Sequence, residues 1–439
     1  MMIAIVERLQ AGEAVAEERF AGWKNALHQL RDAFAGNAPP AVEELHRLTS
    51  PLPADQREAA WQDLASIFLR ESWKSVQGAK VEVLLRSIAD PCHDLLANLL
   101  EEEFLARHQW PAGDAPDPAE YTQRFPNVAG LAERLDSHRC GGGRYVKLSL
   151  CGIGAAGQVW EAHDRRERRT VALKQLAGET AALQDLRRKL HDEYSVAASL
   201  KHPGIIAMND WHGEESIPFF TMELIRGESL SSRIGNLHCP PPSHTARDIA
   251  EARGALLEVF RSLCEAMEFA HSRGILHLDL KPANILIRDG AGPVILDWGG
   301  AREAAARESC GHTAGVIGTR EYMAPEQEDG NPEARSDVFG LGAILYEILT
   351  GRPPRHPSGS IPEDPRHAEG IIPPRSLVPS IPRELDALCL RALAGNPDKR
   401  FSTPSQLGDA VGHLLAREEM PAWRRMLHRI SCQAADPSR

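Results

Sequence analysis

The stretch HLDLKPANILI (residues 277–287) places three polar side chains between two apolar runs: Asp279, Lys281 and Asn284. A carboxylate such as Asp279 can accept a proton from an attacking hydroxyl group. Lys281 can neutralise negative charge, and Asn284 offers an amide oxygen of the kind that Mg²⁺ prefers. This combination predicts a loop that transfers a phosphoryl group, because that reaction needs positioning and charge neutralisation rather than a covalent intermediate.

Three more charged positions support this interpretation. Asp297 follows an apolar run in ILDWGG and would supply a second metal ligand. Lys174 ends the apolar run VALK, and Glu193 lies in the polar, helix-like segment LHDEYSVAASL. A lysine at the end of such a run is most often solvated at a sheet edge. A buried lysine needs a counter-charge, however, and Glu193 is placed to provide it while Lys174 also contacts phosphate.

The glycine string GIGAAGQV lies upstream of these residues, at positions 152–159. Glycine lets a backbone approach phosphate closely and offer its N–H groups. A dinucleotide-binding fold would need a helix directly after the glycines. Here QVWEAHD has the alternation of a strand instead, which points away from a Rossmann fold.

The length and composition of the chain limit the class of protein to which it can belong. With 439 residues the chain exceeds one ordinary core, so two or three domains are expected. A charge of −11 argues against general nucleic-acid binding by counterion release. We find no apolar run of the ~18 residues that span a membrane and no signal peptide. The eight scattered cysteines lack a CxxC pair, so we expect no zinc cluster and a cytoplasmic, reduced chain.

The pattern along the chain predicts an α+β protein. Residues 1–138 have helical periodicity and no catalytic cluster, so we expect a regulatory or docking region, or simply a packing module. Residues 139–144 form a glycine-rich hinge. A small β-rich lobe (145–224) and a larger helical lobe (226–417) follow, with a ligand expected at their junction. Residues 418–439 form a basic tail.

Eight segments occur in a characteristic order: GIGAAGQV, VALK, Glu193, HLDLKPAN, DWG, GTREYMAPEQ, SDVFGLG and PDKRFST. From about Tyr145 to Leu415 the chain therefore resembles the eukaryotic-like (Hanks-type) Ser/Thr protein kinases of bacteria. The resemblance implies a bilobal protein-kinase-like fold, preceded here by the all-α region. It also implies ATP, Mg²⁺ or Mn²⁺, transfer to Ser/Thr hydroxyls of protein substrates, autophosphorylation and a role in signal transduction.

The resemblance also assigns roles. Asp279 would be the catalytic base, Lys281 its phosphate-side partner, and Lys174 and Glu193 the ion pair, while Asn284 and Asp297 would hold the metal. The implied nucleotide contacts are Gly152, Ile153, Gly154, Gly157, Val159, Ala172, Lys174, the gatekeeper Met222, the backbones of Glu223 and Ile225, and Leu286.

Further implied roles are structural or regulatory. Thr319 would bond Asp279 and Lys281, Asp337 would brace the catalytic loop, and Glu326 and Arg400 would form a buried pair. Thr313 and Ser309 are the candidate phosphorylation sites, with Arg302 as a second phosphate receiver.

Three positions depart from the usual pattern. Trp298 replaces the phenylalanine that usually follows the metal-binding acid, here Asp297. Gly300 replaces a larger residue, and Leu278 replaces the arginine that usually precedes the catalytic Asp. Because leucine can donate nothing to a phosphate, we expect phosphorylation of Thr313 to be a weak switch. Control would then fall to the N-terminal helices or to a partner protein bound there.

Two other classes of function compete with an active protein kinase. A pseudokinase scaffold would have lost Lys174, Asp279, Asn284 or Asp297, and all four are present. A small-molecule kinase on a related fold would not need GTREYMAPEQ, which the resemblance implies is a peptide platform.

Overall fold

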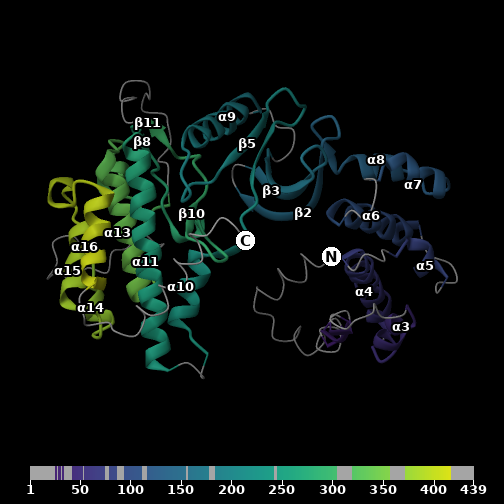
Figure 1. The fold of residues 1–439 in the computed structure, drawn as a ribbon, viewed down its shortest axis with the longest axis horizontal. Helices are drawn as coiled ribbons and strands as arrows, with labels where there is room; N and C mark the ends of the chain where they lie inside the picture. Colours follow the sequence, from purple (N-terminus) through teal and green to yellow (C-terminus); the bar gives the residue numbers. More distant parts are fainter. Residues whose placement is uncertain are drawn as a thin grey trace, which may run out of the picture. The chain divides into compact units, whose positions relative to one another are not determined.

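A computed structural model describes residues 25–26, 28–30, 32–33, 42–52, 54–74, 79–86, 93–110, 116–154, 157–176, 183–241, 245–303, 319–355 and 371–416. The chain divides into two compact units (Figure 1). Unit 1 comprises residues 1–153 and 159–173, and unit 2 comprises residues 154–158 and 174–439.

Unit 1 begins with helices and continues into strands. The described elements are α3 (Glu43–Thr49), α4 (Ala54–Lys74), α5 (Val81–Leu85), α6 (His93–Gln109), α7 (Pro118–Arg124), α8 (Leu131–Asp136), β1 (Arg139–Cys140), β2 (Tyr145–Gly154), β3 (Gly157–Asp164) and β4 (Arg169–Gln175). The end of β2, the start of β3 and the end of β4 belong to unit 2. Trp61, Phe68 and Phe104 pack with the helix leucines in one core. Val146 of β2 belongs to that same core, so the helices and the first strands are packed together.

A buried carboxylate ties three of these helices to one another. Glu103 of α6 is 0% exposed, a position that only a fully bonded acid can hold without large cost. It accepts hydrogen bonds from the Val81 N–H (2.6 Å) and from Arg124 Nη1 (2.7 Å). Arg124 also binds Glu82 with Nη2 at 2.6 Å. This network joins α5, α6 and α7.

The predicted hinge at residues 139–144 lies within unit 1. Arg139 pairs with Val146 and Cys140 with Tyr145, so β1 and β2 form an antiparallel hairpin. Gly141, Gly142 and Gly143 make the turn with φ of 60°, 62° and 83°. Glycine adopts this left-handed region without strain, which explains the glycine string. That these residues also act as a hinge stays a prediction.

Unit 2 contains the remaining elements. They are α9 (Leu183–Ser199), β5 (Met208–His212), β6 (Phe219–Glu223), β7 (Gly227–Ser229), α10 (Leu230–His238), α11 (Ala246–His271), β8 (Ile275–Leu276), the 3₁₀ turn η1 (Pro282–Asn284), β9 (Ile285–Arg288), β10 (Pro293–Ile295), β11 (Arg302–Glu303), α12 (Pro325–Glu328), α13 (Ala334–Thr350), α14 (Pro374–Leu377), α15 (Arg383–Ala392), η2 (Pro397–Lys399) and α16 (Pro404–Ala416). The strand orders are β1-β2-β3-β4-β6-β5, β10-β9-β7 and β11-β8.

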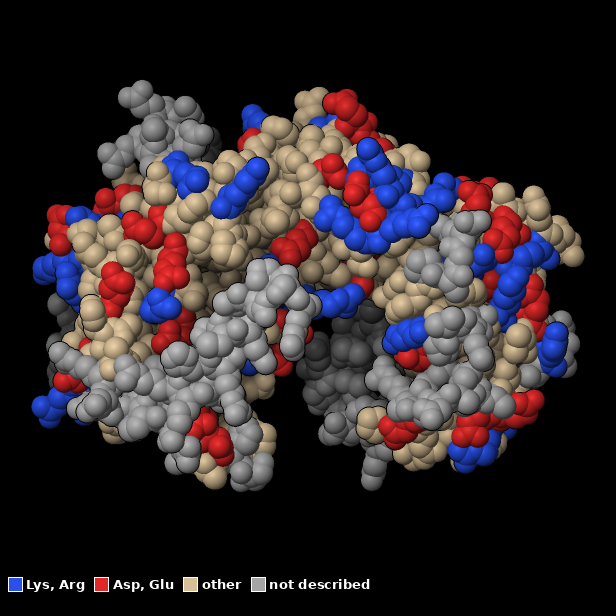
Figure 2. Space-filling view, viewed as in Figure 1, with Lys and Arg blue, Asp and Glu red and all other residues tan. Residues whose placement is uncertain are grey.

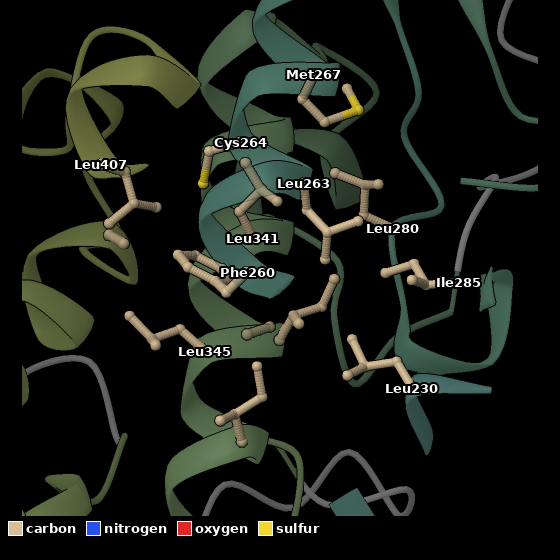
Figure 3. Packing of buried hydrophobic residues seen from close by; sticks show 14 of the residues in the cluster. Leu230, Phe260, Leu263, Cys264, Met267, Leu280, Ile285, Leu341, Leu345 and Leu407 are labelled. Carbon is tan, nitrogen blue, oxygen red and sulfur yellow. The ribbon is translucent and has the colours of Figure 1, made fainter. Parts of the chain in front are cut away.

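Helix α13 forms the centre of the helical part of unit 2. Its residues from Ser336 to Leu349 are all buried, as expected for a helix that is apolar on every side. It packs against α11 and α15 (Figure 1). Leu280 and Ile285, from the loop that opened the sequence analysis, belong to the same core (Figure 3). Packing of Leu280 and Ile285 into this core therefore holds the loop in place.

The predicted fold class is confirmed: a β-rich part precedes a helical part, and a helical region precedes both. Over the C-terminal helices, at the left of Figure 2, acidic and basic side chains are interspersed. Among the described residues, no helix combines the length and the apolar character that a bilayer crossing requires.

Candidate active site

The Asp279 carboxylate, in the loop between β8 and β9, accepts hydrogen bonds from residues of this loop and from Thr319. Asp279 Oδ1 accepts from the N–H and the hydroxyl of Thr319, both at 3.0 Å. Its Oδ2 accepts from Lys281 Nζ at 2.8 Å and from Asn284 Nδ2 at 3.2 Å. Lys281 also donates to Thr319 Oγ1 at 2.8 Å. The structure thus brings together four residues that the sequence singled out, and the bonds fix the direction of the carboxylate.

A buried acid holds the backbone of this loop. Asp337 of α13 accepts from the Leu278 N–H at 2.8 Å, the His277 N–H at 2.9 Å and His271 Nε2 at 2.8 Å. Burial alone would raise the pKa of Asp337. The hydrogen bond and charge of His271, the charge of His277 and the Leu278 N–H together lower this pKa by more than burial raises it, so the net shift is downward. Asp337 therefore braces the loop as an ionised acceptor.

A second cluster joins Lys174 at the end of β4 to Glu193 of α9. Lys174 Nζ lies 2.5 Å from Glu193 Oε1 and 3.5 Å from Asp297 Oδ1. The Lys174 and Glu193 side chains are only 10% and 4% exposed, whereas Asp297 is 45% exposed. The alternative of a solvated lysine at the sheet edge is therefore excluded by the structure.

Each pKa in this cluster follows from its surroundings. Burial lowers the pKa of Lys174, but the two facing carboxylates raise it more, so the net shift is upward. Burial dominates at Glu193 and raises its pKa despite Lys174. At Asp297 the loss of water is outweighed by the positive charge of Lys174, and its pKa falls. Lys174 and Asp297 are thus held in their charged forms.

The two clusters are linked through the backbone before Asp297. The Leu296 N–H donates to the Asn284 carbonyl at 2.8 Å, and His277 Nε2 donates to the Leu296 carbonyl at 3.2 Å. Asn284 uses its amide nitrogen for Asp279, so these bonds leave its amide oxygen available to a metal. An amide oxygen and a carboxylate are hard donors, and they fit Mg²⁺.

The residues predicted to contact nucleotide are divided between the two units. Gly152, Ile153, Val159 and Ala172 belong to unit 1, and Gly154, Gly157, Met222, Glu223, Ile225 and Leu286 belong to unit 2. At Gly157, φ is +139° and an added Cβ would lie 2.2 Å from the Gln175 carbonyl, so only glycine fits. The Glu223 N–H is used by the Ala207 carbonyl, at 2.9 Å.

The substituted aromatic, Trp298, is 1% exposed and its ring lies 4.7 Å from that of His277. Its indole N–H has no hydrogen-bond partner among the described residues. Trp298 therefore keeps the packing of an aromatic residue at this point while burying an unsatisfied donor.

The structural pair is present at the other end of the site. Arg400 Nη1 and Nη2 bind the two oxygens of Glu326, both at 2.7 Å, and the Arg400 side chain is 0% exposed. Ser336 Oγ also donates to Glu326, at 2.6 Å. These bonds fix α12, which begins one residue before Glu326.

The described clusters do not include three residues with predicted roles, and they include one residue that the sequence did not indicate. Thr313 and Ser309 lie outside the described residues, and Arg302 is in β11, paired with Leu276. The missed residue is Gln327 of α12, whose Nε2 donates to the Leu278 carbonyl at 2.6 Å. The motif GTREYMAPEQ contains it, but nothing in the pattern indicates where its side chain points.

Together, an oriented carboxylate with an adjacent ammonium, a buried lysine–glutamate pair and two hard oxygen donors define a phosphotransferase type of site. The family model described as "Protein kinase domain" matches residues 145–411. The chain belongs to the protein kinase family.

Similar proteins carry related names. The chain is 36% identical over 271 residues to "Serine/threonine-protein kinase PknB" of Mycolicibacterium smegmatis, covering 60% of this chain and 42% of that protein. It is 33% identical over 303 residues to "Serine/threonine-protein kinase PknD" of Chlamydia abortus, covering 64% of this chain and 32% of that protein. Among solved structures, the PknI kinase domain of M. tuberculosis matches with a TM-score of 0.47 and 24% identity, over 62% of this chain and 95% of that one. The chain thus spans less than half the length of these two relatives.

Proposed function

We propose that this chain is an active Ser/Thr protein kinase that transfers the γ-phosphoryl group of ATP to hydroxyls of protein substrates and autophosphorylates in bacterial signal transduction. The observation that carries the proposal is the bonding of Asp279 to both Lys281 and Thr319. The names of the relatives support the choice of Ser/Thr over other acceptors.

In this mechanism Asp279 is the base. Thr319 and Asn284 hold its carboxylate in one direction, so that it accepts the proton of an incoming hydroxyl group. Lys281, 2.8 Å from that carboxylate, neutralises charge as the phosphoryl group moves. A positioned base of this kind contributes roughly 10²–10⁴-fold to the rate.

Protein kinases in general depend on ATP and a divalent metal. We assign Mg²⁺, or Mn²⁺, to the oxygens of Asn284 and Asp297, where the metal would supply charge neutralisation. Lys174, held by Glu193, would bind the α- and β-phosphates. A partner protein on the N-terminal helices, and a cytoplasmic location, complete the proposal as predictions from the sequence.

The test is Asp279→Asn in the full chain, incubated with labelled ATP, Mg²⁺ and a generic protein substrate. We expect phosphoryl transfer to fall by ~10²–10⁴-fold while nucleotide affinity stays unchanged. Asp409→Asn, an exposed acid of α16, is the matched control and keeps full activity. Wild-type protein that binds nucleotide without any transfer would replace the proposal with a pseudokinase scaffold. Mass spectrometry of the wild-type products maps the modified residues.

A further inference from the structure

The residue before the proposed base has an unfavourable backbone conformation. Leu278 has φ of +64° and is 5% exposed. A non-glycine residue in the left-handed region is strained, and it persists only where the surroundings fix it. The contacts that fix Leu278 therefore also determine the direction in which the chain enters Asp279.

Those contacts hold the peptide group between Leu278 and Asp279 on both sides. Its N–H, from Asp279, donates to His277 Nδ1 at 3.2 Å. Its carbonyl, from Leu278, accepts from Gln327 Nε2 at 2.6 Å, the shorter of the two bonds. One residue earlier, the Leu278 N–H is bound by Asp337. Of the three partners, Gln327 comes from α12, Asp337 from α13 and His277 from the loop itself.

Gln327 is itself fixed from the opposite direction. It is 7% exposed and lies on α12 directly after Glu326, which Arg400 binds through both oxygens. The Glu326 and Gln327 side chains therefore connect α12 to two different parts of unit 2. A displacement of α12 would therefore act on the peptide before Asp279 through the hydrogen bond that Gln327 donates.

We propose that Gln327 is a positioning residue for the phosphoryl-transfer reaction, because its amide sets the peptide that orients the Asp279 carboxylate. The inference rests on the kinase function proposed above. It gives the loop a link to α12 that needs no phosphate. Such a link suits a chain whose Leu278 cannot receive a phosphate as an arginine would.

The test compares two variants with similar side-chain length, Gln327→Met and Gln327→Glu, in the full chain. Neither can donate to the Leu278 carbonyl at neutral pH. We expect kcat to fall by ~10- to 100-fold, the range that a small misplacement of a reacting group produces. The KM for ATP and the nucleotide affinity should stay within about twofold of wild type, because the lost bond affects only the transfer step.

The matched control is Ser336→Ala, which removes a bond of the same length, 2.6 Å, from α13 to Glu326, the neighbour of Gln327 on α12. It should lower the melting temperature and leave kcat within about twofold. Three results would overturn the inference: normal kcat in a folded Gln327 variant, an equal loss of kcat in Ser336→Ala at the same melting temperature, or failure of both Gln327 variants to fold. Inactive wild-type protein would instead count against the kinase function itself.

Discussion

Removing one partner of the Lys174–Glu193 pair should destabilise the protein far more than removing both. The two side chains are 10% and 4% exposed, so a lone survivor is a buried charge without compensation. Such losses typically cost about 3–5 kcal/mol, whereas replacing both partners with apolar residues is often close to neutral. The perturbation is therefore a double-mutant cycle of Lys174→Met, Glu193→Leu and the combined variant.

The third charge in the cluster sets the order of the two single variants. In Glu193→Leu, the ammonium of Lys174 keeps Asp297 as a partner at 3.5 Å, so this loss lies near the lower end of the range. In Lys174→Met, Glu193 loses the ammonium with which it is paired, so the loss of stability lies near the upper end of that range. We expect a coupling free energy of at least ~2 kcal/mol.

The direction in which pH changes the stability of these variants follows from the pKa of Glu193. Its pKa is raised in the folded protein, so its contribution to stability is fully present below its unfolded pKa and is lost as pH rises through the folded pKa. Without Lys174 this pKa rises further. The Lys174→Met variant should therefore be less destabilised near pH 5 than near pH 8.

The assay is urea unfolding of each variant, followed by circular dichroism at both pH values. The control cycle uses Arg188 and Asp185 on the same helix, an ion pair whose side chains are both 73% exposed, and its coupling should stay below ~1 kcal/mol. If the two single losses at Lys174 and Glu193 add to within ~0.5 kcal/mol of the double variant, the pair is not coupled and the reasoning fails.

Three more predictions are tested separately. Thr313→Ala should keep most activity toward an added substrate, because Leu278 offers no cation to a phosphate; a loss of ~100-fold in initial rate would contradict this. Burial and nearby positive charge lower the pKa of His108 to about 3, so protonation of this residue in the unfolded chain should reduce stability progressively as pH falls below ~6.5, and His108→Phe should make that slope less steep in acid titrations of the full chain. Arg400→Met should lower the free energy of unfolding by about 3–5 kcal/mol, since Glu326 loses both of its bonds to the guanidinium, and a loss below ~1 kcal/mol in urea unfolding would refute it.

The sequence alone was sufficient to predict the residues of the candidate site whose roles depend on charge and on motif order. Asp279, Lys281 and Thr319 were expected to bond to one another, and they do. Lys174 and Glu193 were expected to pair across the interval between a strand and a helix, and they do. The Lys174–Glu193 contact follows from chemistry, because a buried lysine needs a counter-charge. The contacts of Thr319 follow from the family resemblance instead.

Other features depend on geometry that no local pattern encodes. Gln327 could be read from the sequence only as the residue after Glu326, because the target of its amide is a backbone carbonyl 49 positions away. The glycine string after Cys140 predicted flexibility, and the structure shows a hairpin turn in which each glycine has positive φ. Composition cannot distinguish a flexible glycine from a glycine required by a fixed turn.

The exchange of phenylalanine for Trp298 also gives the molecule an internal optical reporter. The indole is 1% exposed beside His277. Indole emission moves to longer wavelength when water reaches the ring, so exposure of Trp298 to water would change the fluorescence without any added dye. The chain has eight tryptophans. The difference spectrum between wild type and Trp298→Phe isolates this single signal, and stopped-flow mixing with nucleotide would then time any change in the surroundings of Trp298 directly.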